Sequence, residues 1–284
     1  MGIDFHSFRL IQRVAAEQSL GAVLTVGRQS VDFDATALGP PPSDPKDAQF
    51  CEWVLLALGA TEAHSIDISN YEGATHISDL GQPTTLPRTY DTVIDAGSLE
   101  HIFDVATAFR NLIGFTAPGG RIVHVLPVNN LSGHGFWQFS SDLIYALYSA
   151  PNGFADTRVY YASSINPDEW RLVPPPRPGT RTELVSLEPV ILLAVTTKQR
   201  SVDTLRVVQP FYDRAWNEGA ETLDSDPSPR SNWLLRAFSR RSRFYRLARN
   251  AHLILGLALG RSRYALSGQR FRRLSPGVLR DDET

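Results

Sequence analysis

The chain has 284 residues, of which 42% are hydrophobic and 20% charged, and its formal net charge is −2. This composition excludes a chain that is disordered throughout, and it is typical of a globular protein with one large core or one core and an appendage. Cys51 is the only cysteine, so an intramolecular disulfide and a cysteine-rich zinc site are excluded, which suits a reducing cytoplasm.

The N-terminal residues give no sign of export. Residues 1–10 contain an acid and a histidine where a signal peptide needs an uninterrupted apolar core. The apolar run at 251–260 is far shorter than the roughly 20 residues that a membrane-spanning helix needs. We therefore expect a cytoplasmic protein.

Buried strands and amphipathic helices alternate along the first half of the chain. Apolar residues three and four apart predict a helix that follows Asp44 and stops at Gly59, and a second helix that begins at Asp104. Strands that alternate with helices are typical of a parallel sheet covered on both faces, and hence of the α/β class. Short apolar runs predict these strands at 21–26, 63–69, 74–80, 90–97 and 121–127.

The pattern continues beyond the fifth strand. A helix is expected from Ser141, followed by strands at 156–163 and 189–198. These two strands could form an antiparallel pair at one edge of the sheet, joined by the proline-rich insertion 165–189.

Charge is distributed unevenly along the chain. Residues 1–226 contain 15 Lys and Arg against 27 Asp and Glu, whereas residues 227–280 contain 13 Arg and no acid. We therefore predict an α/β domain at 1–226 and an arginine-rich helical C-terminal extension at 227–284. The extension could pack on the acidic domain, lie on an anionic membrane, dock on a protein partner or bind RNA. The acidic domain itself does not favour nucleic acid.

Acids and a histidine follow three of the predicted strands. Glu100 and His101 lie just beyond the strand 90–97, and Asp67 and Asp79 end the two strands before it. In an open α/β sheet, ligands bind beyond the carboxyl ends of the strands, which favours a functional site here. The alternative is that these residues only cap helices and turns.

In this order, the motifs SIDIS, SDL, YDTVIDAGSLEHIFD, APGG and RIVHVLP resemble those of the class I S-adenosylmethionine-dependent methyltransferases. The resemblance covers about residues 20–200 and implies a Rossmann-like, mostly parallel seven-stranded sheet with helices on both faces. It also implies S-adenosylmethionine as the cofactor. Asp67 would bind the ribose hydroxyls and Asp79 the adenine amino group, because carboxylates accept such hydrogen bonds. The expected cofactor site also includes Asp95 and Gly97, which lie in the motif YDTVIDAGSLEHIFD, at the end of the predicted strand 90–97.

One motif departs from the family. The first strand of the family usually runs into a turn with several glycines, but here TVGRQSVDFD offers only Gly27 near the strand end. Side chains such as Gln29 and Asp32 could replace the missing backbone contacts, or the domain could have lost its cofactor. Because both acids are retained, we expect cofactor binding, with Gly27 and Gln29 in the site.

The stretch GHGFWQFS follows the fifth strand and places His134 between two glycines. The glycines give this loop freedom to present an imidazole to a ligand. Three aromatic residues nearby could cover the cofactor sulfonium or stack on a substrate, or they could belong to the core: Phe136, Trp137 and Phe139.

Methyl transfer to a hydroxyl needs a group that takes the proton, and histidine suits this role. We predict His134 as the general base, on a loop that closes when substrate is present, with Glu100 and His101 positioning the acceptor. Some members of the family hold magnesium with Glu and Glu-His groups, but Gly97 stands where another acid would help, so Mg²⁺ is not favoured and no metal is predicted.

The sequence gives only a weak indication of the substrate that would accept the methyl group. The acidic domain favours a small molecule or saccharide, and we predict O-methylation of a hydroxyl on a sugar, glycan or small natural product. The alternative is a non-catalytic methyltransferase fold that serves as a scaffold or binds a membrane or protein partner through its basic C-terminus. A homo-oligomer is left open.

Overall fold

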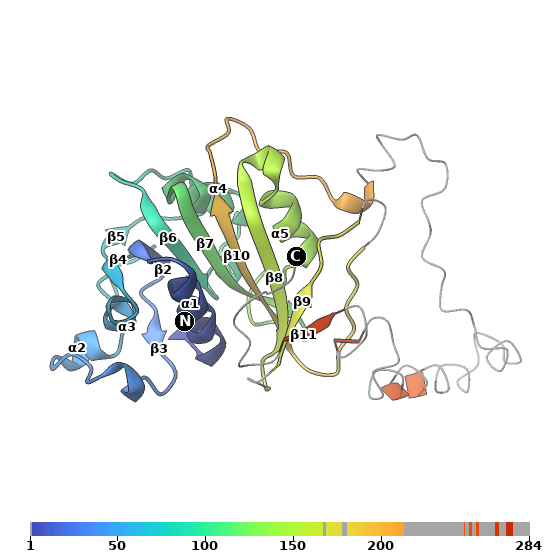
Figure 1. Ribbon diagram of the computed structural model, residues 1–284, viewed down its shortest axis with the longest axis horizontal. Coiled ribbons are helices and arrows are strands. Elements are labelled where there is room, and N and C mark those ends of the chain that lie inside the picture. Colours follow the sequence, from blue (N-terminus) through green and yellow to red (C-terminus); the bar gives the residue numbers. More distant parts are fainter. Residues whose placement is uncertain are drawn as a thin grey trace, which may run out of the picture.

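The computed structural model contains a large sheet with helices on both faces (Figure 1). Most of the predicted extension 227–284 lies outside the part of the chain that the structure describes. The described residues are 2–166, 169–177 and 181–212, with short stretches at 247, 250–251, 254–255, 265–266 and 271–274.

Among the described residues the large sheet has nine strands, which run in spatial order from β11 at one edge to β5 at the other. A separate two-stranded sheet pairs β1 (Gly2–Ile3) with β3 (Ser30–Val31). The large sheet consists of β11 (Arg272–Leu274), β9 (Trp170–Val173), β8 (Phe154–Ser163), β10 (Val190–Lys198), β7 (Thr116–Asn129), β6 (Tyr90–Ala96), β2 (Gly21–Val26), β4 (Ala60–Asp67) and β5 (His76–Ile77).

The sheet is mixed, which corrects the expected seven-stranded, mostly parallel sheet. The strands β5, β4, β2, β6 and β7 are parallel to one another, whereas β10 is antiparallel to both β7 and β8. Beyond β8, the strands β9 and β11 pair antiparallel and widen the sheet. The expected antiparallel pair of 156–163 and 189–198 is confirmed by β8 and β10. The strand at Arg272–Leu274 shows that the C-terminal segment is not helical throughout.

Helices cover both faces, as predicted. Apolar residues of α4 (Val105–Phe115) and α5 (Ser141–Leu147) pack on one face with Leu24 of β2, whereas α1 (Phe5–Glu17) and α3 (Glu52–Ala57) pack on the other face with Val23. Successive side chains of a strand point to opposite faces, so this alternation fills two cores. Burial of each large apolar side chain, such as Leu112 in α4, contributes about 1.5–3 kcal/mol.

Two helices differ from the sequence prediction. The expected helix between Asp44 and Gly59 is divided into α2 (Pro45–Ala48) and α3, because Phe50 between them pairs with Ser30 and the amide of Cys51 donates to the carbonyl of Gln29. The helix α1 was not predicted, although Asp4 caps it by accepting a hydrogen bond from the amide of Ser7. The described residues also form three short 3₁₀ turns: η1 (Thr36–Leu38), η2 (Leu99–His101) and η3 (Ala150–Asn152).

The order of the parallel strands defines where a ligand would bind. From β2 the chain winds outward through β4 to β5, then returns to form β6 and β7 on the other side of β2. This is the order of a doubly wound sheet, and its winding direction reverses between β2 and β6. In such sheets, ligands bind beyond the carboxyl ends of the strands at this reversal.

Among the described residues, the structure has no helix long and apolar enough to span a membrane.

Candidate functional site

A cavity of about 420 Å³ opens at the reversal between β2 and β6. Its volume lies in the range of pockets that bind small molecules and cofactors. The lining comes from the ends of the strands β2 and β4 and from the loops after β5, β6 and β7. It includes four of the predicted site residues: Gly27, Asp67, Asp79 and His101.

Asp67 and Asp79 both line the cavity, at the ends of the paired strands β4 and β5. Each carboxylate accepts a hydrogen bond from a backbone amide two residues further on, at 3.1 Å from Ser69 and at 2.8 Å from Gly81. The amide of Ser78 also donates to the carbonyl of Asp67 at 2.8 Å, which joins the two strand ends. A carboxylate oxygen can accept more than one hydrogen bond, so both acids can also bind donors in the cavity.

Gly27 forms the turn that follows β2 and lines the cavity. Its φ of +74° lies in the left-handed region that favours glycine, and its amide donates to the carbonyl of Ile66 at 2.7 Å. At this position, a ligand can approach the backbone without meeting a side chain.

Gln29 and Asp32 do not line the cavity. Gln29 is fully buried, and its amide nitrogen donates to the carbonyl of Val26 and to Oγ of Ser98, so it braces the turns after β2 and β6. Its Oε1 is buried with no hydrogen-bond partner among the described residues. Asp32 lies near β1 and β3, where its carboxylate accepts from Ser30 at 2.9 Å.

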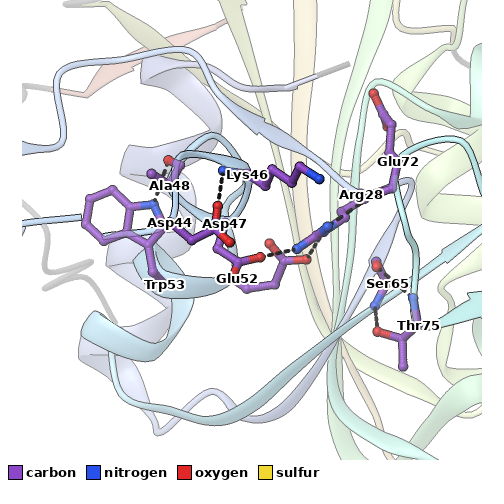
Figure 2. Close-up of polar contacts among 10 residues, drawn as sticks. All are labelled: Arg28, Asp44, Lys46, Asp47, Ala48, Glu52, Trp53, Ser65, Glu72 and Thr75. Atoms are coloured by element: carbon purple, nitrogen blue, oxygen red, sulfur yellow. Dashed lines mark hydrogen bonds and ion pairs between the residues drawn. The ribbon is translucent and has the colours of Figure 1, made fainter. Parts of the chain in front are cut away.

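Arg28, which the sequence analysis did not single out, holds the loop between Asp67 and Asp79 (Figure 2). Its guanidinium donates to the carboxylates of Glu52 and Asp47 at 2.7 and 3.3 Å, and to the carbonyl of Glu72 at 2.9 Å. The guanidinium also lies 4.1 Å from the centroid of the Phe50 ring. This one side chain therefore connects the segment 47–52 to the loop between Asp67 and Asp79.

Asp95 and Gly97 lie beneath the cavity rather than on its wall. Asp95 is fully buried and accepts hydrogen bonds from the amides of Ser98 and Leu99 at 3.0 and 3.2 Å, which shapes the turn after β6. Gly97 begins this turn with a φ of +79°. The other oxygen of Asp95 bonds to Nδ1 of His124 at 2.9 Å, and Nε2 of that histidine bonds to the hydroxyl of Tyr148. Sequence reasoning missed this buried chain, whose only signal was a histidine inside the apolar strand 121–127.

Glu100, His101 and His134 come together at the edge of the cavity, as the sequence predicted. One ligand atom from each lies within 4.8 Å of the others, and Oε1 of Glu100 is 3.5 Å from Nε2 of His134. The side chain of Glu100 is 1% exposed, and its Oε2 has no hydrogen-bond partner among the described residues. Burial, reinforced by the charge of Asp95, raises the pKa of Glu100 to about 8. Burial and the neighbouring His134 lower the pKa of His101.

The loop that carries His134 packs against Glu100. The amides of Phe136 and Trp137 donate to the carbonyl of Glu100 at 2.7 and 3.3 Å. A Cβ atom on Gly135 would lie 2.7 Å from Cγ of Glu100, so this close approach requires glycine. These contacts hold the backbone next to His134 against Glu100.

The three aromatic residues of this loop have different surroundings. Phe139 is buried and packs on Phe109 of α4, so it belongs to the core. Phe136 lines the cavity with 69% of its surface exposed, and its ring meets that of Phe103 edge to face at 6.3 Å. The indole of Trp137 donates to the carbonyl of Ile102 at 2.9 Å. The mouth of the cavity therefore has an exposed aromatic rim.

The comparisons with known proteins give structural neighbours only. No family model matches the sequence, and no curated protein matches it. The N-methyltransferase NodS from Bradyrhizobium japonicum WM9, in complex with S-adenosyl-L-homocysteine, is 15% identical with a TM-score of 0.41, over 70% of this chain and 91% of that chain. An S-adenosylmethionine-dependent methyltransferase from Mesorhizobium loti is 19% identical with a TM-score of 0.31, over 44% of this chain and 55% of that one.

A third neighbour is the phosphoethanolamine N-methyltransferase 2 of Haemonchus contortus, in complex with phosphomonomethylethanolamine and S-adenosylhomocysteine. It is 12% identical with a TM-score of 0.45, over 68% of this chain and 52% of that chain. At these identities the likeness concerns the fold alone.

Proposed function

We propose that this chain is an S-adenosylmethionine-dependent methyltransferase that acts on a hydroxyl group of a sugar, glycan or small natural product. The observation that carries the proposal is one cavity, near the reversal point of the sheet, that both Asp67 and Asp79 line. Two carboxylates in one cavity suit a ligand with several donors, such as a ribose diol and an exocyclic amine.

The lining residues fit such a cofactor from end to end. Asp67, which ends β4, would accept from the ribose hydroxyls, and Asp79 would accept from the adenine amino group. Gly27 would allow the methionine end to approach the backbone, because nothing larger than hydrogen projects from its Cα atom. When bound, S-adenosylmethionine supplies an electrophilic methyl group on a sulfonium.

The cluster at the edge of the cavity would serve the acceptor. His101 lines the cavity, and Glu100 and His134 lie beside it, so an acceptor hydroxyl placed there would face the bound methyl group. These side chains would orient the acceptor oxygen in line with the carbon–sulfur bond, so that a new oxygen–carbon bond would replace it and its electron pair would stay on sulfur. We assign the proton of the hydroxyl to the imidazole of His134, which is 55% exposed and therefore accessible to an acceptor.

The test is transfer of a labelled methyl group from S-adenosylmethionine to a panel of sugars, phenolic compounds and primary amines. We expect label in a base-stable ether product with the wild-type chain and very little with His134→Ala. Label in an amine product would overturn the assignment of a hydroxyl acceptor. Absence of any transfer, combined with no binding of the cofactor, would favour the non-catalytic scaffold instead.

A further inference from the structure

The cluster of Glu100, His101 and His134 has the features of a metal site. The three side chains offer one carboxylate oxygen and two imidazole nitrogens, all within 4.8 Å of one another. Oε2 of Glu100 is buried and has no hydrogen-bond partner among the described residues. A buried carboxylate oxygen without a partner carries a free-energy cost that a bound cation would remove.

The spacing of two of the ligands is already that of a coordinated pair. Zinc binds histidine nitrogen and carboxylate oxygen at about 2.0–2.2 Å in tetrahedral geometry, which places two such ligand atoms about 3.4 Å apart. Oε1 of Glu100 and Nε2 of His134 are 3.5 Å apart. The third ligand, His101, is exposed and offers a ring nitrogen within 4.8 Å of the ligand atoms of the other two.

The fold holds this spacing through backbone contacts. The amides of Phe136 and Trp137 bond to the carbonyl of Glu100, and Gly135 lies directly against the Glu100 side chain. His101 belongs to the same 3₁₀ turn, η2, as Glu100. The site therefore does not depend on a loop that closes when the ion arrives.

We propose that Glu100, His101 and His134 bind one divalent transition-metal ion of the zinc, manganese and iron class at the edge of the cavity. Two imidazoles and one carboxylate suit these ions, whereas magnesium prefers oxygen ligands. Three protein ligands leave at least one coordination position open. Because His101 also lines the cavity, this position is available to an acceptor oxygen.

The role of the ion rests on the proposed function, but its binding does not. A bound ion would hold the acceptor oxygen and favour loss of its proton to solvent, because a metal ion lowers the pKa of the oxygen that it binds. Coordination would occupy the lone pair of His134, so the ion would take over the task that this imidazole has in the metal-free site. The metal-bound site and the metal-free site would use the same three side chains.

The experiment is a calorimetric titration of the untagged, metal-free, full-length chain with Zn²⁺, Mn²⁺ and Mg²⁺ in turn, without S-adenosylmethionine. We expect one Zn²⁺ per chain, and binding about 100-fold or more tighter than that of Mg²⁺. Glu100→Gln and His134→Ala should each weaken Zn²⁺ binding by about 10-fold or more. Glu100→Gln keeps the shape of a buried side chain, and His134 is largely exposed, so a thermal melt should show both variants folded.

His76→Ala is the matched control. His76 and His64 both contact the hydroxyl of Tyr90, at 2.8 and 2.9 Å, and form a second histidine pair outside the cluster. The control should bind Zn²⁺ like the wild type. No saturable Zn²⁺ binding up to about 1 mM, or binding lost in His76→Ala and retained in His134→Ala, would overturn the proposal.

A titration with S-adenosylhomocysteine in the same preparations separates this proposal from the proposed function. Zn²⁺ binding at the cluster without binding of S-adenosylhomocysteine would support the metal site and contradict the methyltransferase. Binding of S-adenosylhomocysteine without binding of Zn²⁺ would contradict the metal site and leave the proposed methyltransferase function standing.

Discussion

Replacing Asp67 with alanine should weaken the binding of S-adenosylhomocysteine by about 10- to 150-fold. The carboxylate lies on the cavity wall at the end of β4, where we expect it to accept hydrogen bonds from the ribose. A hydrogen bond to a charged group contributes about 1.5–3 kcal/mol, and every 1.4 kcal/mol changes an affinity by a factor of about ten.

The variant should remain folded. Asp67 is not part of either core, and its carboxylate accepts one backbone hydrogen bond at an exposed turn, from the amide of Ser69. Loss of that bond should cost about 1 kcal/mol of the free energy of unfolding. Calorimetry gives the affinity, and a thermal melt reports the fold.

Asp34→Ala is the matched control, because it removes the same charge from an exposed turn that does not line the cavity. It should leave the affinity unchanged. An unchanged dissociation constant in folded Asp67→Ala would refute the assignment of this acid to the ribose.

Three further predictions test the site and its support. His134→Ala should lower kcat by about 10²-fold or more and leave the affinity for S-adenosylhomocysteine nearly unchanged in calorimetry; full activity would reject its role. Arg28→Ala should lower the free energy of unfolding in urea by about 2 kcal/mol, whereas the more exposed Arg88→Ala should lower it by less than about 1; equal losses would contradict the bracing role of Arg28. Burial lowers the pKa of His6, whose neutral ring accepts from Trp170 and donates to a carbonyl, so the unfolded chain binds more protons near pH 6. Stability should therefore fall as the pH drops below about 6.5, and this fall should be smaller in His6→Gln; the same dependence in both chains would contradict the assignment.

The central strands were predictable because their signals are local. The apolar run at 21–26 and those that end near Asp67 and Ala96 became β2, β4 and β6. The cap of α4 was equally local, since Asp104 accepts a hydrogen bond from the amide of Thr107. The signal for α1 was also present, as an Asp4 cap followed by apolar residues at helical spacing, and it was overlooked.

One edge of the sheet, formed by β9 and β11, was not predictable from local patterns. The strand β11 pairs with β9, about 100 residues earlier in the chain, and such long-range pairing leaves little trace in strands of three or four residues. The break between α2 and α3 has a similar origin, because the pairing of Phe50 with Ser30 overrides the local helical periodicity. Tertiary contacts decided these elements.

The site was predicted in part. Asp67, Asp79 and His101 line one cavity because each follows a parallel strand, and Glu100 and His134 meet beside them, as expected. The roles of buried polar residues were harder to assign. Asp95 shapes a turn rather than lining the cavity, since the partners that hold it are known only from the folded structure.

The most direct test of the central claim is a calorimetric titration of the full-length chain with S-adenosylhomocysteine. We expect saturable one-to-one binding that competes with S-adenosylmethionine, because we propose the cavity lined by Gly27, Asp67 and Asp79 as the cofactor site. A folded chain that binds neither compound would contradict the methyltransferase assignment and favour the scaffold.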